Sequence, residues 1–457
     1  DWLLLSQHDG LVALALSPDG LTRQAASWPL GPQLDLTSLA VAGRSAWALT
    51  EGNTAGSSLI GPGDLGSETQ GGLLWLNLET MRDGSTASEP AHAWFADTPG
   101  QAGMMARFGS VVCIWMRLEA NATGIWQAVD LSDPRRARPL GRLTMPYGVH
   151  WLLPTGTTSA LALRWRSDLK SGSVLRLDLG DLLHPRVIEE LSLGSSFPAS
   201  MSRSGNIVAI SLDSRDNVAA TSGYQLLLDN PGQRLVDHGS IPVTRGDDTF
   251  FIDKGRGYLA TYGNAAAGEA GGTEPGFRYR VQVYDLESRP PRSMGYLPFE
   301  AFAFFRAGDE VFALLPSEEP DGSTRVATVL LADPPSRSSV RQVIALGDNI
   351  QLRGSPIEWD RRMLFSELTT LPDGSLVWPA FYKTRPPQFG LQQLRRSEPA
   401  GSWTAGPALD MDLEGFVSPS LSYGNGWLAF LSGWDNELGW SESASDSSRL
   451  ELLRIGR

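Results

Sequence analysis

Short apolar segments alternate with polar turns along the whole chain, and one such pattern returns six times. Each copy is an apolar run that ends in an acidic or amide residue and continues into a polar turn, which usually contains Pro or Gly. The copies are centred on Asn77, Asp130, Asp178, Asp229, Asp285 and Asp333, at intervals of 53, 48, 51, 56 and 48 residues. A repeat of about 50 residues that is built from strands predicts an all-β fold, a β-propeller.

Each repeat divides into four strand-like segments, which we call A to D from the centre of the predicted ring outward. These segments are short, rich in Val, Ile, Leu, Trp and Tyr, and bounded by Gly, Pro, Asn or Asp. In the second unit they cover 103–109, 111–119, 124–131 and 138–145. The same order recurs over 39–95, 150–193, 200–241, 249–297 and 304–346, and less regularly over 356–409. The pattern therefore predicts seven internal units.

The two ends of the chain predict how the ring closes. Segment 10–31 is similar to a C and a D segment, whereas 426–434 and 448–456 are similar to a B and a C segment. A composite blade from 1–38 and 420–457 would close a ring of eight blades, so that residues 1–457 form a single propeller domain without a long open edge. This assignment leaves about two strands over, which an extra hairpin or one misassigned segment would explain. A seven-bladed ring, with 356–409 misassigned, is the alternative.

The best-formed copy of the pattern reads AVDLSDPRRARPLGRL, residues 128–143. It resembles the LVIVD-type propeller repeats of bacterial secreted and surface proteins, in which an apolar strand ends in Asp and a Ser-Asp-Pro turn follows. Residues 283–297 and 175–191 match in part. The resemblance implies a periplasmic or cell-surface propeller with a mostly non-catalytic role, and it transfers no functional residue to this chain.

The charge and the apolar content narrow the range of partners. The chain has 38 Lys and Arg against 51 Asp and Glu, a formal net charge of -13. A nucleic-acid backbone or an anionic membrane surface is therefore not the expected partner. No run of 18 or more apolar residues is present, so the sequence predicts no membrane-spanning helix.

The single cysteine and the first residue bear on the compartment. Cys113 is the only cysteine, which excludes an internal disulfide and a cysteine metal cluster. It lies in the strand-like run SVVCIWM, where a buried structural thiol is expected. The chain opens at Asp1 without Met, as a mature product would after removal of a signal peptide. We therefore expect an exported protein, periplasmic or extracellular.

Residues with ligand or acid–base chemistry are few. The five histidines never occur at His-x-His or His-x-x-x-His spacing, and His150, at a predicted channel mouth, is the candidate for a lone functional histidine. Asp213, Asp216 and Asn217 bring oxygen atoms together in a predicted B–C turn, which suggests a Ca²⁺ site. A solvated turn without metal is the alternative. The sequence contains no phosphate-binding loop, serine elbow or nucleotide fingerprint.

Long turns and exposed aromatic residues indicate where a partner would bind. The turns over 52–71, 263–276 and 434–447 are long, rich in Gly, Ser and Ala, and all join a B to a C segment, which places them on one face. Near the C-terminus, Trp434, Asp435, Asn436 and Trp440 combine indole rings with polar groups, as protein hot spots and sugar sites do. The turns could also be insertions without a role.

Two classes of function follow from these observations. The first is a non-enzymatic scaffold of an exported bacterial assembly, which binds a protein partner through its B–C face and needs no cofactor. The second is a carbohydrate-active or metal-dependent enzyme, or a glycan-binding propeller, with its site at the channel mouth. The fold alone does not decide between them.

Overall fold

The computed structural model is built of antiparallel β-strands. It describes the backbone of the strands between Trp2 and Arg454 with parts of the connections, and side chains only between 110 and 406, in both cases with gaps. Within this part the strands form eight sheets, and the single helical element is the 3-10 turn η4 (Pro335–Arg337). None of the described residues forms a helix long and apolar enough to cross a bilayer. The all-β class expected from the sequence is confirmed.

Six of these sheets each consist of four strands that are consecutive in the chain and paired in chain order. They are β4 (Leu34–Ala42), β5 (Ser45–Gly52), β6 (Gly72–Asn77) and β7 (His92–Phe95); β8 (Gln101–Phe108), β9 (Val111–Leu118), β10 (Thr123–Asp130) and β11 (Arg138–Pro146); β12 (Val149–Pro154), β13 (Ser159–Arg166), β14 (Ser171–Asp178) and β15 (Arg186–Gly194); β16 (Phe197–Ser204), β17 (Ile207–Asp213), β18 (Gly223–Leu228) and β19 (Val236–Pro242); β20 (Thr249–Asp253), β21 (Arg256–Asn264), β22 (Phe277–Asp285) and β23 (Arg292–Tyr296); and β24 (Ala303–Ala307), β25 (Glu310–Leu315), β26 (Arg325–Leu330) and β27 (Ser339–Ile344). The strands of each sheet occupy the A to D positions expected from the sequence.

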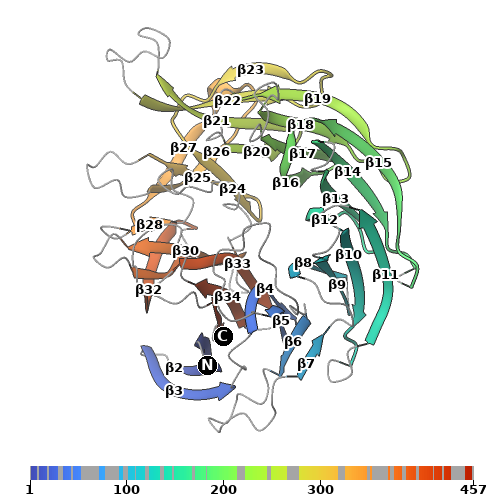
Figure 1. Ribbon diagram of the computed structural model, residues 1–457. Coiled ribbons are helices and arrows are strands. Elements are labelled where there is room, and N and C mark those ends of the chain that lie inside the picture. The colour runs from blue at the N-terminus through green and yellow to red at the C-terminus, as the bar shows by residue number, and fades with distance from the viewer. Residues whose placement is uncertain are drawn as a thin grey trace.

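A seventh sheet contains β28 (Ile350–Leu352), β30 (Leu376–Tyr382), β31 (Gln388–Arg396) and β32 (Trp403–Glu414), with β29 (Thr369–Thr370) paired to β30. The eighth contains strands from both ends of the chain in the order β33 (Phe416–Gly424), β34 (Trp427–Gly433), β35 (Ser448–Arg454), β1 (Trp2–Gln7), β2 (Gly10–Ser17) and β3 (Gly20–Trp28). In this sheet β1 pairs with β35, and Leu4 lies opposite Leu452. Figure 1 shows the sheets following one another in chain order around a common centre.

The sheet that joins the two ends differs from the sequence assignment. Segment 10–31 was expected to supply its third and fourth strands, but the structure has β35 and β1 in those positions and places the β2–β3 hairpin outside them. The β2–β3 hairpin accounts for the two strands that the sequence assignment left over, as the extra hairpin considered above.

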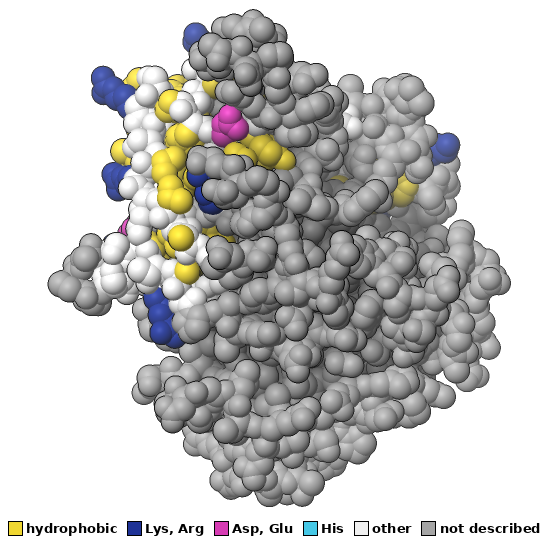
Figure 2. All heavy atoms as spheres, turned by 90° about the vertical axis from the view of Figure 1, so that its left-hand side faces the viewer, with side chains coloured by type: hydrophobic (Ala, Val, Ile, Leu, Met, Phe, Trp, Pro, Cys, Tyr) yellow, Lys and Arg dark blue, Asp and Glu magenta, His cyan; other side chains and the backbone are white. Residues whose placement is uncertain are grey.

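Burial within a sheet falls from the inner strands to the outermost strand. In β13 five successive residues are buried, and in β25 all but the first are. The outer strands β15 and β27 instead consist mostly of exposed and partly buried residues, and Ile344 at the end of β27 is the one buried residue in the two strands. Inner strands are covered by neighbours on both faces and can be continuously apolar, whereas the outer strand has one wet face. Some apolar side chains still reach the surface: Val343 is 49% exposed, and Figure 2 shows described apolar side chains beside Lys and Arg on one side of the molecule.

The apolar clusters join neighbouring sheets face to face. One cluster combines Leu161 and Leu163 of β13 with Val208 and Ile210 of β17. The other clusters in the described part likewise draw their residues from two successive sheets. Full burial of one such side chain contributes about 1.5–3 kcal/mol, so these contacts are the main force between sheets. Four-stranded sheets packed in this way around a centre have the β-propeller arrangement, and we call them blades.

A β-bulge recurs in the outer strand and is held by a glutamine. Gln127, Gln225 and Gln392 each lie in a C strand, and each donates its side-chain amide to a glycine carbonyl 14 residues later in the D strand, at 2.9–3.1 Å. At each of these pairs the register shifts by one residue. A bulge leaves a carbonyl outside the ladder, and the amide satisfies it. At the middle pair the glycine is required, because Gly239 has a φ of +108° and a Cβ there would lie 2.9 Å from Pro291.

Removal of one glutamine is expected to destabilise the fold without changing its shape. Gln225 donates both to the Gly239 carbonyl and to Asp237 Oδ1, at 3.0 and 2.7 Å. The Gln225→Ala substitution should lower the free energy of unfolding by about 1–2 kcal/mol, since both acceptors lose a donor. Urea denaturation measures this loss. Gln233→Ala, at an exposed turn position, is the matched control and should change stability by less than about 0.5 kcal/mol.

The buried thiol provides a probe of unfolding. Cys113 lies in β9 and is 3% exposed, and burial raises its pKa to about 12. Because the thiolate is the reactive form, a disulfide reagent at pH 8 should not label the native protein but should label one thiol per chain in denaturant. If the native protein were labelled as fast as an exposed thiol, Cys113 would not be buried as described. Cys113→Ser controls for the signal, since the chain has one cysteine.

Candidate functional site

The sites suggested by the sequence fall largely outside the described residues. Trp434, Asp435, Asn436 and Trp440 lie outside them, as do Asp216 and Asn217. Asp213 is the last residue of β17, and its side chain is not described. These residues therefore stay predictions. Among the described residues no group of three or more His, Cys, Asp or Glu is placed to hold a metal ion.

His150 lies in β12, the first strand of the β12–β15 sheet. The register with β13 shifts between Val149 and Trp151, so His150 is the extra residue of a β-bulge. Bulges re-aim the side chain that they carry. The side chain of His150 is not among the described ones, and its role stays a prediction.

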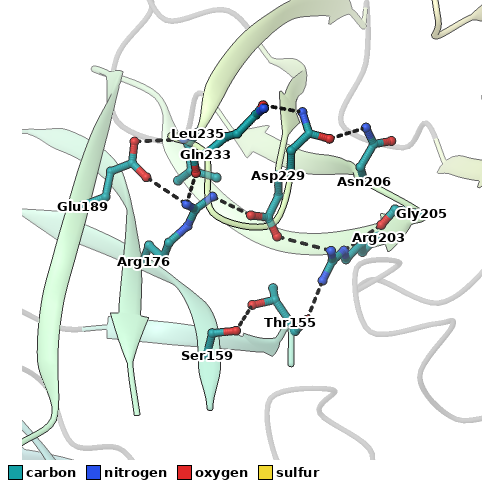
Figure 3. Close-up of polar contacts among 11 residues, drawn as sticks. Thr155, Ser159, Arg176, Glu189, Arg203, Gly205, Asn206, Asp229, Gln233 and Leu235 are labelled. Carbon is teal, nitrogen blue, oxygen red and sulfur yellow. Dashed lines mark hydrogen bonds and ion pairs between the residues drawn. The ribbon is translucent and has the colours of Figure 1, made fainter. Parts of the chain in front are cut away.

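The most connected polar site that is described lies between two blades, at the end where A–B and C–D turns meet (Figure 3). Its centre is Asp229, which follows β18 and is 6% exposed. Arg176 of β14, in the preceding blade, places a guanidinium nitrogen 2.5 Å from Asp229 Oδ1. Arg203 of β16 lies 3.4 Å from Oδ2. One buried carboxylate is thus shared by arginines of two blades.

Further contacts extend this site to the neighbouring turns. Arg176 also lies 3.4 Å from Glu189 Oε2 and donates to the carbonyl of Gln233. Glu189 Oε1 accepts a hydrogen bond from the backbone of Leu235 at 2.9 Å. Arg203 donates to the carbonyl of Thr155 at 3.1 Å. The cluster contains two arginines and two carboxylates, so its formal charge is zero and every charge has a partner.

Equivalent contacts occur at the junction between the β20–β23 and β24–β27 blades. Arg306 of β24 lies 2.6 Å from Asp253 at the end of β20, 53 residues earlier. Arg256 bonds Asp285 of its own blade and, at 2.8 Å, Asp333 of the next blade. The Asp333 carboxylate, with further help from Asp285, raises the pKa of Arg256 above its usual range. An arginine of one blade and a carboxylate of an adjacent blade therefore form a recurring link.

At two other junctions, hydrogen bonds that involve no arginine join adjacent blades. His238, 4% exposed, donates from Nε2 to the carbonyl of Leu286 at 2.6 Å, which fixes the Nε2–H tautomer when the imidazole is neutral. Gln342 of β27 accepts from and donates to the backbone of Trp403 in the next blade, at 3.0 and 2.6 Å. The Trp403 indole donates to Glu310 of β25.

The aspartates that end the C strands stabilise turns. Asp130 and Asp178 accept a backbone N–H two residues later, from Ser132 and Gly180, at 2.9 and 3.0 Å. These N–H bonds first, and then the arginines that follow, Arg138 and Arg186, hold the pKa of each carboxyl below its usual range. Both pairs are exposed, so they contribute little to stability. A lowered pKa at this place therefore reports turn formation and not acid–base catalysis.

Sequence reasoning found one side of these links and missed the other. Asp229, Asp285 and Asp333 mark the repeat in the sequence and proved to be link carboxylates. Arg176, the partner of Asp229, and Arg256, the partner of Asp333, lie in the preceding repeat, whereas Asp285 shares its repeat with Arg256. An arginine at a fixed offset of about one repeat from an aspartate, as in the 53-residue spacings of Arg176–Asp229 and Asp253–Arg306, was the available signal.

Comparisons with known proteins give no family. No family model and no curated protein matches the chain. Among solved structures it is similar to the β-propeller domain of the Trilobed protease from Pyrococcus furiosus, at 12% identity, with 79% of this chain and 95% of that chain covered and a TM-score of 0.39.

Two further solved structures are similar over more of the chain. For the computationally designed protein Ika8 the identity is 10%, the coverage 93% and 97%, and the TM-score 0.46. For a prolyl endopeptidase the identity is 11%, the coverage 92% of this chain and 55% of that one, and the TM-score 0.45. Similarity at this level assigns no activity to the chain.

Proposed function

We propose that the protein is a non-enzymatic interaction scaffold with an eight-bladed, closed ring, and that it binds a protein partner through the B–C face. The pairing of β1 with β35 supports closure by both ends of the chain. The links between blades support a rigid body, because each joins two successive blades. Within the same proposal, the resemblance to LVIVD-type repeats supports export to the periplasm or the cell surface.

The observation that carries the proposal is the distribution of charge over the connections. Strands alternate in direction within each blade, so all B–C connections leave from the same edge. They are 53–71, 119–122, 167–170, 214–222, 265–276, 316–324, 383–387 and 434–447. These 76 residues contain 14 Asp and Glu against four Lys and Arg, so they hold -10 of the net charge of -13. An acidic face of this kind favours a partner with a basic surface and speeds its association.

The test compares two variants that change the net charge equally. Glu318→Gln, Glu319→Gln and Asp321→Asn together neutralise one B–C connection, and Asp181→Asn, Glu287→Gln and Asp309→Asn are the control on turns of the other face. Each immobilised protein is exposed to native envelope fractions, and the captured proteins are quantified. A partner that is captured stoichiometrically by the wild type and the control, but not by the B–C variant, supports the proposal.

Two outcomes would count against this function. Equal loss of the partner in both variants would indicate general charge attraction. Failure to capture any stoichiometric partner, together with binding of Ca²⁺ or a glycan in a direct screen, would favour the alternative of a metal-dependent or glycan-binding propeller.

A further inference from the structure

The outermost strand of a blade pairs with one neighbour only. In the sheets that end in β15, β19, β23 and β27, this last strand is hydrogen-bonded to the C strand and to no other strand of the described part. Its second edge therefore carries backbone N–H and C=O groups that no strand covers. Such an edge can pair with a strand of another molecule, and natural sheets contain features that prevent this.

One irregularity interrupts this edge at the same position in four successive blades. The third residue of the outer strand has no partner in the C strand, and the register shifts by one there. A bulge bends the strand and breaks the regular alternation of its backbone groups. After the bulge, at most four residues of each strand remain in register. The bulge residues are Ile188 in β15, His238 in β19, Met294 in β23 and Arg341 in β27.

In β27 the bulge residue is also the only charged residue of the strand. The strand reads SVRQVI, and without Arg341 it would read SVQVI. An apolar, β-branched segment without charge or Pro has the composition of strands that associate edge to edge. The other three outer strands keep charged residues outside the bulge: Arg186, Glu189 and Glu190 in β15, Asp237 in β19 and Arg292 in β23.

The Arg341 side chain is not engaged in holding the blade. It is exposed, and it forms no hydrogen bond or ion pair with a described residue. The neighbouring Gln342 instead exchanges two hydrogen bonds with the backbone of Trp403, which fixes β27 against the next blade. Val343 is 49% exposed. The outer strand is thus held in place, with an apolar side chain and an unpaired charge at the surface.

We propose that the bulge at Arg341 keeps the outer edge of β27 from pairing with the same edge of a second copy of this chain. Two copies paired in this way would be related by a twofold axis. Because Arg341 lies near the middle of the strand, its two guanidinium groups would come close together, and like charges across a strand pair are unfavourable. The extra residue also interrupts the ladder at that point. The inference does not depend on the scaffold function.

The test deletes Arg341 from the full-length protein. The deletion leaves Val340 and Gln342 opposite their present partners, Val329 and Thr328, and straightens the edge. Sedimentation equilibrium over a range of protein concentrations measures self-association. The deletion should raise the association constant at least about tenfold above that of the wild type, since two or three new cross-strand pairs amount to this factor.

Two further variants separate edge pairing from misfolding and charge from backbone. Val343→Lys, added to the deletion, returns a charge to the straightened edge and should bring the association constant to within about twofold of the wild type. Arg341→Gln removes the charge but keeps the extra residue, so it should raise the constant less than the deletion does. Tryptophan fluorescence and the urea midpoint show whether each variant is folded.

Three results would overturn the proposal. A folded deletion variant that associates no more than the wild type would show that the bulge does not protect this edge. Association that persists after the addition of Val343→Lys would place the contact elsewhere or indicate misfolding. An equal rise for Arg341→Gln and for the deletion would show that the extra residue has no part in the effect.

Discussion

Replacement of Asp229 by alanine is expected to lower the free energy of unfolding by about 3 kcal/mol, because it leaves a buried arginine without its main partner. The Asp229 side chain is 9% exposed and that of Arg176 is 12% exposed. Without Asp229, the guanidinium of Arg176 keeps only Glu189, at 3.4 Å, and the carbonyl of Gln233. The same substitution releases Arg203, so the link between the two blades is lost at its centre.

Urea denaturation, followed by tryptophan fluorescence, measures this effect. Asp178→Ala is the matched control, since Asp178 pairs with an arginine that is 71% exposed, and it should cost less than about 1 kcal/mol. A double variant, Asp229→Ala with Arg176→Met, should recover part of the loss, because it removes the unpaired charge. If Asp229→Ala and Asp178→Ala cost the same, the cluster does not hold the blades together.

Replacement of Phe312 by alanine is expected to cost about 4 kcal/mol. Phe312 lies in β25 and has no exposed surface. Its ring stacks on Phe305 at 4.9 Å between centroids and meets the edge of Trp403, in the next blade, at 5.1 Å. The substitution therefore opens a cavity at a contact between two blades, where neither sheet can collapse without moving the other.

The control for this cavity is Tyr296→Ala, which removes a ring that is 54% exposed and should change stability by less than about 1 kcal/mol. Hydrogen exchange gives a second readout, because loss of Phe312 should lower amide protection in both β25 and β32. A loss of protection confined to β25, or a cost near that of the control, would contradict a shared core between these blades.

The candidate sites show why chemistry was harder to predict than strands. The repeat pattern identified Asp229 as the end of an apolar run, but a carboxylate at a strand end fits a solvated turn and a buried ion pair equally well. Its partner Arg176 lies 53 residues earlier, so no local pattern reports the contact. The sequence analysis chose its candidates by residue type and by place in the repeat, and their roles stay predictions: His150, Asp213, Asp216, Asn217, Trp434, Asp435, Asn436 and Trp440.

The sequence by itself determined the secondary structure and the order of strands within a blade. The segments 103–109, 111–119, 124–131 and 138–145 became β8, β9, β10 and β11 almost residue for residue. This succeeds because burial of an inner strand demands a continuous apolar run, and a turn demands Gly, Pro, Asn or Asp, so both signals are local.

Only the tertiary structure decided how the blades meet. The place of β1 beside β35 and the choice of Arg176 as a partner of Asp229 depend on contacts one repeat or more apart. Such contacts are set by the way successive sheets pack face to face, and the same arginine can be a solvated side chain in one blade and a buried partner in another. Packing therefore decides which charges of a repeated sequence hold the ring and which stay free at its surface.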